Sequence, residues 1–213
     1  MIYLHGFASS SRSGKASFFA QRCREAGIGF EAPDLNLPDF STLTVTRMLE
    51  QSGALLDRAT DPVTLIGSSL GGYVAVLAAA RWPGTVKNVV LMAPALDFSA
   101  KGLSGPGGAN VGDWQRDGQL NVFHFGYGRM MPVHYELYED ARRYDAMKAV
   151  LPMPALVFQG RRDTAVDPAT VKAWSEARPN VELHLLNDDH QLGASLDLMW
   201  DRTYQYLTRP VST

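Results

Sequence analysis

A short glycine and serine pattern, Gly67-Ser68-Ser69-Leu70-Gly71, restricts the possible folds more than any other part of the chain. An apolar run from Val63 to Ile66 precedes it, and a small-residue helical stretch from Tyr73 to Ala80 follows it. A serine on a sharp turn between a buried strand and a helix has an exposed hydroxyl, and the flanking glycines relieve crowding at the turn. The pattern therefore predicts that Ser69 is a nucleophile. The alternative is a helix N-terminus that Ser68 or Ser69 only caps.

A nucleophilic serine needs a base, and the base needs an acid that holds its tautomer. Asp163 follows the strand-like run Ala155 to Gln159, and His190 follows the run Val181 to Leu185. The order serine, acid, histidine is the one used by folds with this nucleophile turn. Because the carboxyl ends of parallel strands meet at one edge of a sheet, we expect Ser69, Asp163 and His190 to come together there.

Other residues compete for the role of the acid. Asp163 could be a solvated loop charge paired with Arg161 or Arg162, and Asp167 lies only a few residues further on. Asp167 is followed by Pro168, which is typical of a helix N-cap and first turn. Asp163 directly follows the strand and its glycine turn, so it is the preferred acid.

Other histidines compete for the role of the base. His184 lies inside a predicted strand, while His124 and His134 lie in an irregular middle region and remain alternatives. His190 is preferred because it comes after the last predicted strand and before the last predicted helix. We interpret His5 as a structural residue of the loop after the first strand.

Acyl transfer passes through an oxyanion, so the site must also present backbone N–H groups. One is expected from Leu70, which follows the nucleophile at a helix N-terminus where the dipole favours negative charge. The other is expected from Phe7, because the short strand Ile2 to Leu4 leads into a His-Gly pair. Gly6 would let the backbone approach the substrate closely.

Together these segments resemble the α/β-hydrolase superfamily; they are His5-Gly6-Phe7, Gly67-Ser68-Ser69-Leu70-Gly71-Gly72, Gly160-Arg161-Arg162-Asp163 and Asp189-His190. The start Tyr3-Leu4-His5-Gly6-Phe7-Ala8-Ser9-Ser10, with Ser13-Gly14-Lys15-Ala16, is similar to small bacterial esterases of the YqiA type. The serine block is also similar to related serine thioesterases that remove long acyl chains. The resemblance covers the chain ends and core but fades between about residues 97 and 150. It implies a serine hydrolase acting on carboxylic ester or thioester bonds, without specifying the acyl group.

Alternating strands and helices predict an α/β fold with a mainly parallel sheet of about six strands and helices on both faces. The predicted strands are 2–4, 28–32, 63–66, 86–92, 155–159 and 181–185, and the predicted helices are 14–26, 43–58, 70–81, 169–177 and 194–207. Because the first strand already carries the His-Gly loop, the chain is a minimal version of the hydrolase fold. We expect one domain over residues 1–213, with a cap-like insertion at about 97–138.

The predicted cap is rich in glycine, aromatic residues and methionine. We expect Phe123, Phe125, Met130 and Met131 to line an apolar pocket for the acyl chain. The alternative is that these side chains only bury the cap against the core. A nearby run, Gly105-Pro106-Gly107-Gly108, lacks the lysine of a phosphate-binding loop.

Composition limits the partners that we expect. The chain of 213 residues has 20 basic and 22 acidic residues, a net charge of −2, which gives no electrostatic reason to expect nucleic acid or an anionic membrane. Cys23 is the only cysteine, which excludes an internal disulfide, and the N-terminal residues lack the features of a signal peptide. We therefore expect a cytoplasmic enzyme that needs no metal or organic cofactor and acts on a small ester or thioester.

Several functions are compatible with the same three side chains. The preferred function is hydrolysis of small to medium acyl esters or thioesters through an acyl-enzyme. The alternatives are a non-catalytic homologue that only binds a ligand, an acyltransferase, or a hydrolase of carbon–carbon bonds. The sequence specifies neither the acyl chain length nor the oligomeric state.

Overall fold

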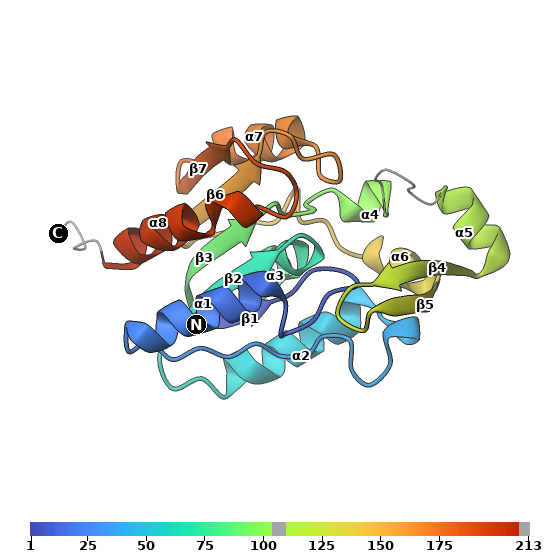
Figure 1. Cartoon of the computed structure of the whole chain (residues 1–213), viewed down its shortest axis with the longest axis horizontal. Helices are drawn as coiled ribbons and strands as arrows, with labels where there is room; N and C mark the ends of the chain where they lie inside the picture. Colours follow the sequence, from blue (N-terminus) through green and yellow to red (C-terminus); the bar gives the residue numbers. More distant parts are fainter. Residues whose placement is uncertain (104–109, 209–213) are drawn as a thin grey trace.

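A parallel β-sheet forms the centre of the computed structural model, which describes residues 1–103 and 110–208 (Figure 1). In this part of the chain the sheet has five strands in the order β1-β2-β3-β6-β7. They are β1 (Ile2–Leu4), β2 (Val63–Ser68), β3 (Val86–Met92), β6 (Ala155–Gly160) and β7 (Val181–Leu186). Every neighbouring pair is parallel, so all the carboxyl ends lie at one edge.

Alternate residues of the strands face two separate apolar layers. In β3, Val89 and Leu91 pack with one cluster, whereas Val90 and Met92 pack with the other. This alternation follows from the two-residue repeat of a strand, and burial on both faces explains the nearly continuous apolar sequence of β2, β3 and β6.

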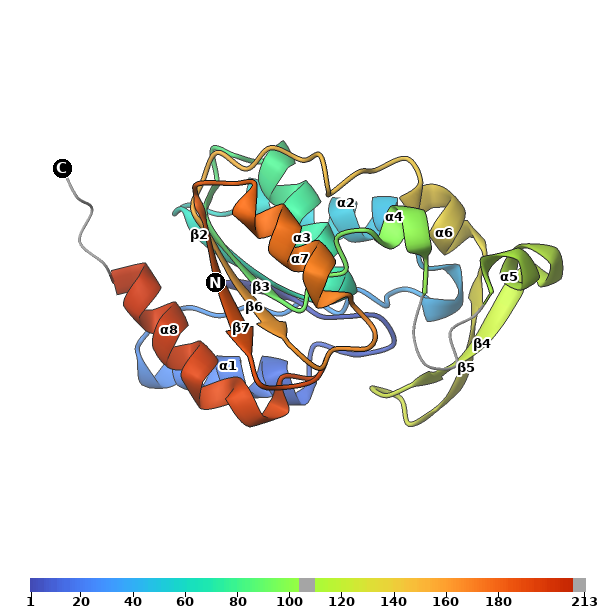
Figure 2. The same cartoon turned by 90° about the horizontal axis from the view of Figure 1, so that it is seen from above.

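Helices cover both faces of the sheet. Figure 2 shows α1 (Gly14–Glu25) and α8 (Leu196–Thr208) on one face, with α2 (Val45–Asp57), α3 (Leu70–Arg81) and α7 (Pro168–Glu176) on the other. The ends of these helices are close to those predicted, and side chains cap the N-termini of α1, α2 and α7. Thr44 accepts a hydrogen bond from the N–H of Arg47 at 3.1 Å, and Ser13 accepts one from Ala16 at 3.3 Å.

The α/β fold was predicted, but the strand expected at residues 28–32 is not formed. This segment makes a single parallel bridge between Ile2 and Glu31, in which Tyr3 N–H donates to Glu31 O at 2.8 Å. Gly27 has a positive φ of 67° just before the segment, and Pro33 follows it. Because proline has no N–H to donate, the ladder cannot continue past this point. The sheet therefore has one strand fewer than expected.

The predicted cap region contains regular structure that the sequence did not indicate. Two strands form an antiparallel hairpin, β4 (Gln119–His124) and β5 (Arg129–His134). Around it lie α4 (Phe98–Lys101), α5 (Val111–Asp117) and α6 (Glu136–Ala141), and short 3₁₀ turns occur elsewhere at η1 (Phe40–Thr42) and η2 (Gly193–Ser195). Figure 2 shows the hairpin extending beyond the edge of the main sheet. Residues 104–109, including the Gly-Pro-Gly-Gly run, lie outside the described residues.

Buried aromatic side chains attach the hairpin to the rest of the molecule. Trp114 of α5 is almost fully buried, and its indole N–H donates to Val133 O at 3.1 Å. His124 is fully buried and packs edge-on against Phe40 of η1, with ring centroids 4.6 Å apart. These contacts hold β4 next to the carboxyl edge of the sheet. No helix within the described ranges has the length and apolar character needed to cross a membrane.

Candidate active site

Ser69 occupies the sharp turn between β2 and α3. Its backbone has φ 53° and ψ −118°, a conformation that residues other than glycine rarely adopt. Such a conformation costs on the order of 1–3 kcal/mol and persists where the surroundings impose it. The Ser69 N–H donates to Met92 O at 2.9 Å, and Ser69 O accepts the N–H of Gly72 at 2.9 Å. The turn is therefore fixed from both β3 and α3.

Two glycines around the turn are required by close packing. A Cβ atom on Gly71 would lie 2.1 Å from Leu4 O, and one on Gly67 would lie 2.4 Å from Gly71 O. Gly6 on the neighbouring loop is also close, because its added Cβ would lie 3.2 Å from Ser69 Cβ. Glycine at these positions lets β1, β2 and the start of α3 approach one another around Ser69.

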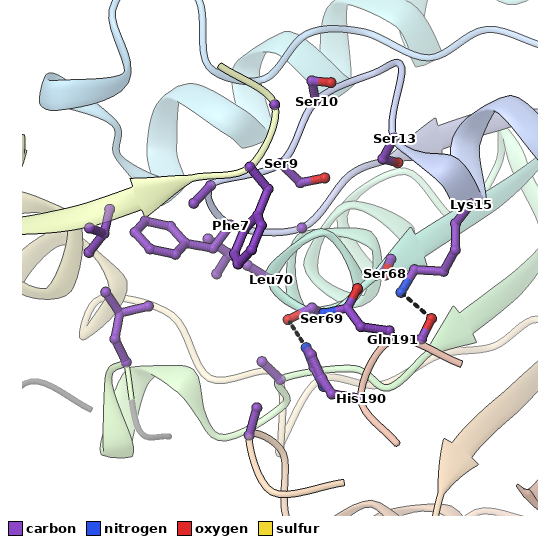
Figure 3. Close-up of a pocket in the computed structure, with 18 of the residues that line it drawn as sticks. Phe7, Ser9, Ser10, Ser13, Lys15, Ser68, Ser69, Leu70, His190 and Gln191 are labelled. Atoms are coloured by element: carbon purple, nitrogen blue, oxygen red, sulfur yellow. Dashed lines mark hydrogen bonds between the residues drawn. The ribbon is translucent and has the colours of Figure 1, made fainter. Parts of the chain in front are cut away.

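The structure brings Ser69, His190 and Asp163 into one chain of hydrogen bonds. His190 Nε2 lies 3.1 Å from Ser69 Oγ, and His190 Nδ1 lies 2.8 Å from Asp163 Oδ2 (Figure 3 shows the first of these contacts). The three residues follow β2, β6 and β7, as the sequence order predicts. In this arrangement Nδ1 donates to the carboxylate, so Nε2 is free to accept the serine proton.

The Asp163 carboxylate is held on both oxygens. Oδ1 accepts the backbone N–H groups of Ala165 at 2.9 Å and Val166 at 2.8 Å, and Oδ2 also accepts Gln159 Nε2 at 2.9 Å. Burial by itself would raise the pKa of Asp163, but the hydrogen bonds, led by that from His190, outweigh it and hold the pKa below its ordinary value. Asp163 is therefore an ionised partner for the imidazole at neutral pH.

The competing acid and bases have other places in the structure. Asp167 caps α7, where its Oδ1 accepts the N–H of Ala169 at 3.0 Å. His184 lies in β7 beside Glu182, with Nε2 and Oε1 2.8 Å apart, and His134 lies in β5. His124 is buried under the hairpin, where burial is the main reason that its pKa is lowered.

The two predicted oxyanion donors lie beside Ser69. Phe7 and Leu70 both line the cavity into which Ser69 opens, and in the described structure neither backbone N–H donates to a protein acceptor. His5 supports this loop, because its Nδ1 donates to Gly6 O at 2.9 Å and its Nε2 accepts the N–H of Leu35 at 3.0 Å. These bonds use both ring nitrogens of His5, as a structural role requires.

Ser69 and His190 open into a cavity of about 1250 Å³. The predicted pocket residues Phe123 and Phe125 line it, together with Leu120 and Val122 of the same hairpin. Met130 and Met131 are not among its lining residues. The reason is that only β4 and the turn face the cavity, whereas Met130 in β5 is 59% exposed and Met131 packs against the core. The pocket therefore uses one strand of the hairpin.

Sequence reasoning missed several residues of the site. Gln159 was seen only as the end of a strand, although its amide donates to Asp163. Lys15 was seen only as part of a family motif, yet it lines the cavity and its Nζ donates to Gln191 O at 2.9 Å. The Lys15 contact joins residues 176 apart and the Gln159 contact depends on how the loop after β6 folds back, so neither leaves a periodic signal in the sequence.

The model of the uncharacterised protein family UPF0227 matches residues 1–201. The chain belongs to UPF0227. This family member shares its fold with the α/β-hydrolases. A provisionally assigned hydrolase from Agrobacterium vitis S4 superposes with a TM-score of 0.82 at 25% identity, covering 95% of this chain and 85% of that one.

Two further solved structures show the same fold. Mouse α/β hydrolase domain-containing protein 10 has a TM-score of 0.80 at 21% identity, covering 97% of this chain and 88% of that one. Est1E from Butyrivibrio proteoclasticus, solved with ferulic acid bound, has a TM-score of 0.81 at 20% identity, covering 97% and 86% of the two chains. The fold of this UPF0227 member and its hydrolase neighbours support hydrolase activity.

Proposed function

We propose that this protein is a serine hydrolase that cleaves carboxylic ester or thioester bonds through an acyl-enzyme intermediate. The observation that carries the proposal is the hydrogen-bonded chain from Ser69 Oγ through His190 to Asp163, which opens into a cavity of about 1250 Å³. A buried carboxylate, an oriented imidazole and a serine on a strained turn form the arrangement that activates a hydroxyl nucleophile.

The first half-reaction acylates the enzyme. His190 Nε2 takes the Ser69 proton as Oγ bonds to the carbonyl carbon, and the carbonyl oxygen gains the negative charge. The free N–H groups of Phe7 and Leu70 are the groups that bind this oxyanion. The imidazolium then protonates the leaving alcohol or thiol as its bond to the acyl carbon breaks.

The second half-reaction releases the acid. Water loses a proton to His190 as its oxygen attacks the acyl carbon, and the bond to Ser69 Oγ breaks as the histidine returns the proton to it. The products are the carboxylic acid, the alcohol or thiol, and the unchanged enzyme. Apart from the substrate and water, the mechanism uses only groups that the chain itself supplies.

Labelling with a fluorophosphonate tests whether the serine is activated. The probe should add one phosphonyl group to the wild-type protein, seen by intact mass, and none to Ser69→Ala. Ser41→Ala is the matched control and should be labelled like the wild type, because Ser41 is a partly buried serine of η1 that does not line the cavity. Wild-type protein that remains unlabelled would favour a non-catalytic ligand-binding role.

A substrate panel tests the reaction itself. Wild-type protein should hydrolyse p-nitrophenyl esters or acyl-coenzyme A thioesters, and Ser69→Ala should lose roughly 10⁴- to 10⁶-fold in turnover with an unchanged melting curve. Transfer of the acyl group to an added alcohol, in place of water, would indicate an acyltransferase. Full turnover in Ser69→Ala would exclude the proposed mechanism.

A further inference from the structure

The loop between β1 and α1, together with the first turn of α1, forms a polar side of the cavity. We call it the basic wall, and its lining residues are Ser9, Ser10, Arg12, Ser13 and Lys15. Figure 3 shows Phe7 and Leu70 on one side of Ser69, and Ser13 and Lys15 on the other. The nucleophile thus lies between an apolar region and a region of hydroxyls and cations.

Lys15 is a partly buried cation with unused hydrogen-bonding capacity. Its Nζ donates to Gln191 O at 2.9 Å, and no second hydrogen bond or contact ion pair of this ammonium occurs within residues 1–103 and 110–208. An ammonium has three N–H groups, so two remain available. Burial lowers the pKa of Lys15 to about 8, although the charges of Asp163, Asp189 and Asp188 act in the opposite direction. An unpaired buried cation is unfavourable unless something compensates it.

The charge of the cavity wall is unbalanced. Arg12 and Lys15 line it, and no aspartate or glutamate is among its described lining residues. The Arg12 side chain is exposed and makes no ion pair within the described part of the chain. Tyr3, which also lines the cavity, is fully buried, and its hydroxyl has no hydrogen-bond partner among the described residues. Burial raises the pKa of Tyr3 to about 12, while the hydroxyls of Ser68 and Ser13 act in the opposite direction. A cavity with such a wall attracts negative charge.

The position of Lys15 indicates which part of a substrate it would meet. Its partner Gln191 directly follows His190, the residue that protonates the leaving group in the proposed mechanism. The apolar surface of Phe7, Leu70 and Phe123 lies elsewhere on the cavity wall and suits an acyl chain. Lys15 is therefore on the leaving-group side of Ser69.

We propose that the basic wall binds an anionic group, a carboxylate or a phosphate, on the alcohol or thiol part of the substrate, with Lys15 as its main ligand. The inference rests on the proposed function and narrows it to acyl esters or thioesters with a negatively charged leaving group. Lys15 donates hydrogen bonds to the anion and forms no bond to the reacting carbonyl. A carboxylate and a phosphate share this chemistry, and separate substrates distinguish them.

The test compares three phenyl butyrates that carry a neutral carboxamide, a carboxylate or a phosphate at the para position. We compare kcat/KM for each in the wild type and in Lys15→Met, so intrinsic differences in leaving-group reactivity cancel. The kcat/KM of the anionic ester divided by that of the neutral ester should fall roughly 10- to 100-fold in Lys15→Met, because a charge-assisted hydrogen bond is lost. Most of this fall should come from a higher KM for the anionic ester. Whichever ester shows the larger fall, the carboxylate or the phosphate, identifies the anion that the basic wall prefers. The exposed Lys87→Met in β3 is the matched control and should keep the wild-type ratio.

Lys15 also anchors the loop of His190, so a uniform fall for all three esters would show that it only positions Gln191 and would overturn the inference. If Lys15→Met does not fold, Arg12→Gln replaces it, because the exposed Arg12 should tolerate the change. An anionic-to-neutral ratio that falls in Arg12→Gln supports the basic wall, and an unchanged ratio contradicts it.

Binding measurements separate this inference from the proposed reaction. Phenyl phosphate and benzoate are titrated calorimetrically into Ser69→Ala and into the double variant Ser69→Ala/Lys15→Met. Binding to the first that weakens at least 10-fold in the second supports the basic wall, even if no ester is hydrolysed and the proposed function fails. Hydrolysis of neutral esters without binding of either anion would support the proposed function and contradict anion binding at the basic wall.

Discussion

The two carboxylate oxygens of Asp163 accept hydrogen bonds from different groups. Oδ1 accepts the N–H groups of Ala165 and Val166, which fix the side chain in its loop, and Oδ2 faces His190 and Gln159. The backbone bonds set the direction from which the carboxylate meets the imidazole. An isosteric amide could keep the bonds from Ala165 and Val166 through its oxygen, but its NH2 group would replace the oxygen that accepts from His190 and Gln159.

We therefore expect Asp163→Asn to fold but to lose roughly 10⁴-fold in kcat, because the amide no longer selects the tautomer with a proton on Nδ1. The measurement is p-nitrophenyl butyrate turnover beside a melting curve. Asp167→Asn is the matched control, since asparagine also caps helices well and Asp167 only caps α7. A loss of activity in Asp167→Asn equal to that in Asp163→Asn would contradict the assignment of the acid.

The lowered pKa of Asp163 predicts a stability change in acid. In the unfolded chain its pKa is about 3.9, and in the folded protein it is lower. The unfolded state therefore binds a proton first, so the stabilisation is complete above the unfolded pKa and is lost as the pH falls through the folded pKa. Urea unfolding between about pH 6 and 3 should show a steeper loss for wild type than for Asp163→Asn. Parallel curves would mean that the hydrogen bonds to Asp163 do not favour its ionised form.

At the scale of elements, the hairpin β4–β5 determines the shape of the cavity. Phe123 and Phe125 line it from β4 and the turn, while Met130 projects from β5 and is exposed. Phe125 itself is 74% exposed, so it contributes little to the stability of the fold. A side chain of this kind has room to contact a bound acyl chain.

We expect Phe123→Ala and Phe125→Ala to change the chain-length preference across p-nitrophenyl acetate to decanoate, with losses of a few-fold to about 10-fold for the longer esters, because contact area is removed. The melting temperature should change little. Met130→Ala is the matched control from the same hairpin and should retain the wild-type preference. A lower melting temperature with unchanged preference would indicate that the two phenylalanines only pack the hairpin.

The elements that were predictable are those with strong local signals. The buried strands and the turn of Ser69 follow from apolar runs and glycines, and the helix at Pro168 follows from its cap. The hairpin was not predictable, because Pro132 lies within β5 and argues against a strand. It is tolerated because β5 pairs with a neighbour on one side only in the described structure, where a missing N–H need not break a ladder.

The residues of the site also divide into those that the sequence predicts and those that it does not. Ser69, Asp163 and His190 are brought together as expected because each follows a strand of a parallel sheet, whose carboxyl ends must meet. Lys15 and Gln159 could not be assigned roles in this way. Their importance comes from contacts with Gln191 and Asp163 that depend on how loops fold back at the sheet edge.

For the molecule as a whole, the distribution of charge around the cavity is a better guide to the charge of its substrates than the net charge. The chain is slightly acidic overall, at −2, yet its cavity wall carries Arg12 and Lys15. The carboxylates near Lys15 are on the loops after β6 and β7 and do not line the cavity in the described residues. The charged side chains that line the cavity are therefore basic although the chain as a whole is slightly acidic.

This distribution predicts that the preference for anionic esters depends on pH. Lys15 has a pKa of about 8, so it is charged at pH 7 and loses its charge as the pH rises through 8. The ratio of kcat/KM for the para-carboxylate and para-carboxamide esters should fall between about pH 7 and 9, after correction for spontaneous hydrolysis. The ratio in Lys15→Met should stay flat, and a wild-type ratio that is equally flat would contradict the prediction. The charged groups that act on Lys15 are Asp163, Asp188 and Asp189, and the other ionisable groups that line the same cavity are Arg12, His190 and Tyr3.

The spacing of the three reacting side chains has a consequence for protein synthesis. Ser69 is translated 121 residues before His190, which lies on the loop after β7. A polypeptide that stops short of this loop therefore carries Ser69 without its proposed base. Under the proposed mechanism, activity would appear only after the loop that carries His190 has been made.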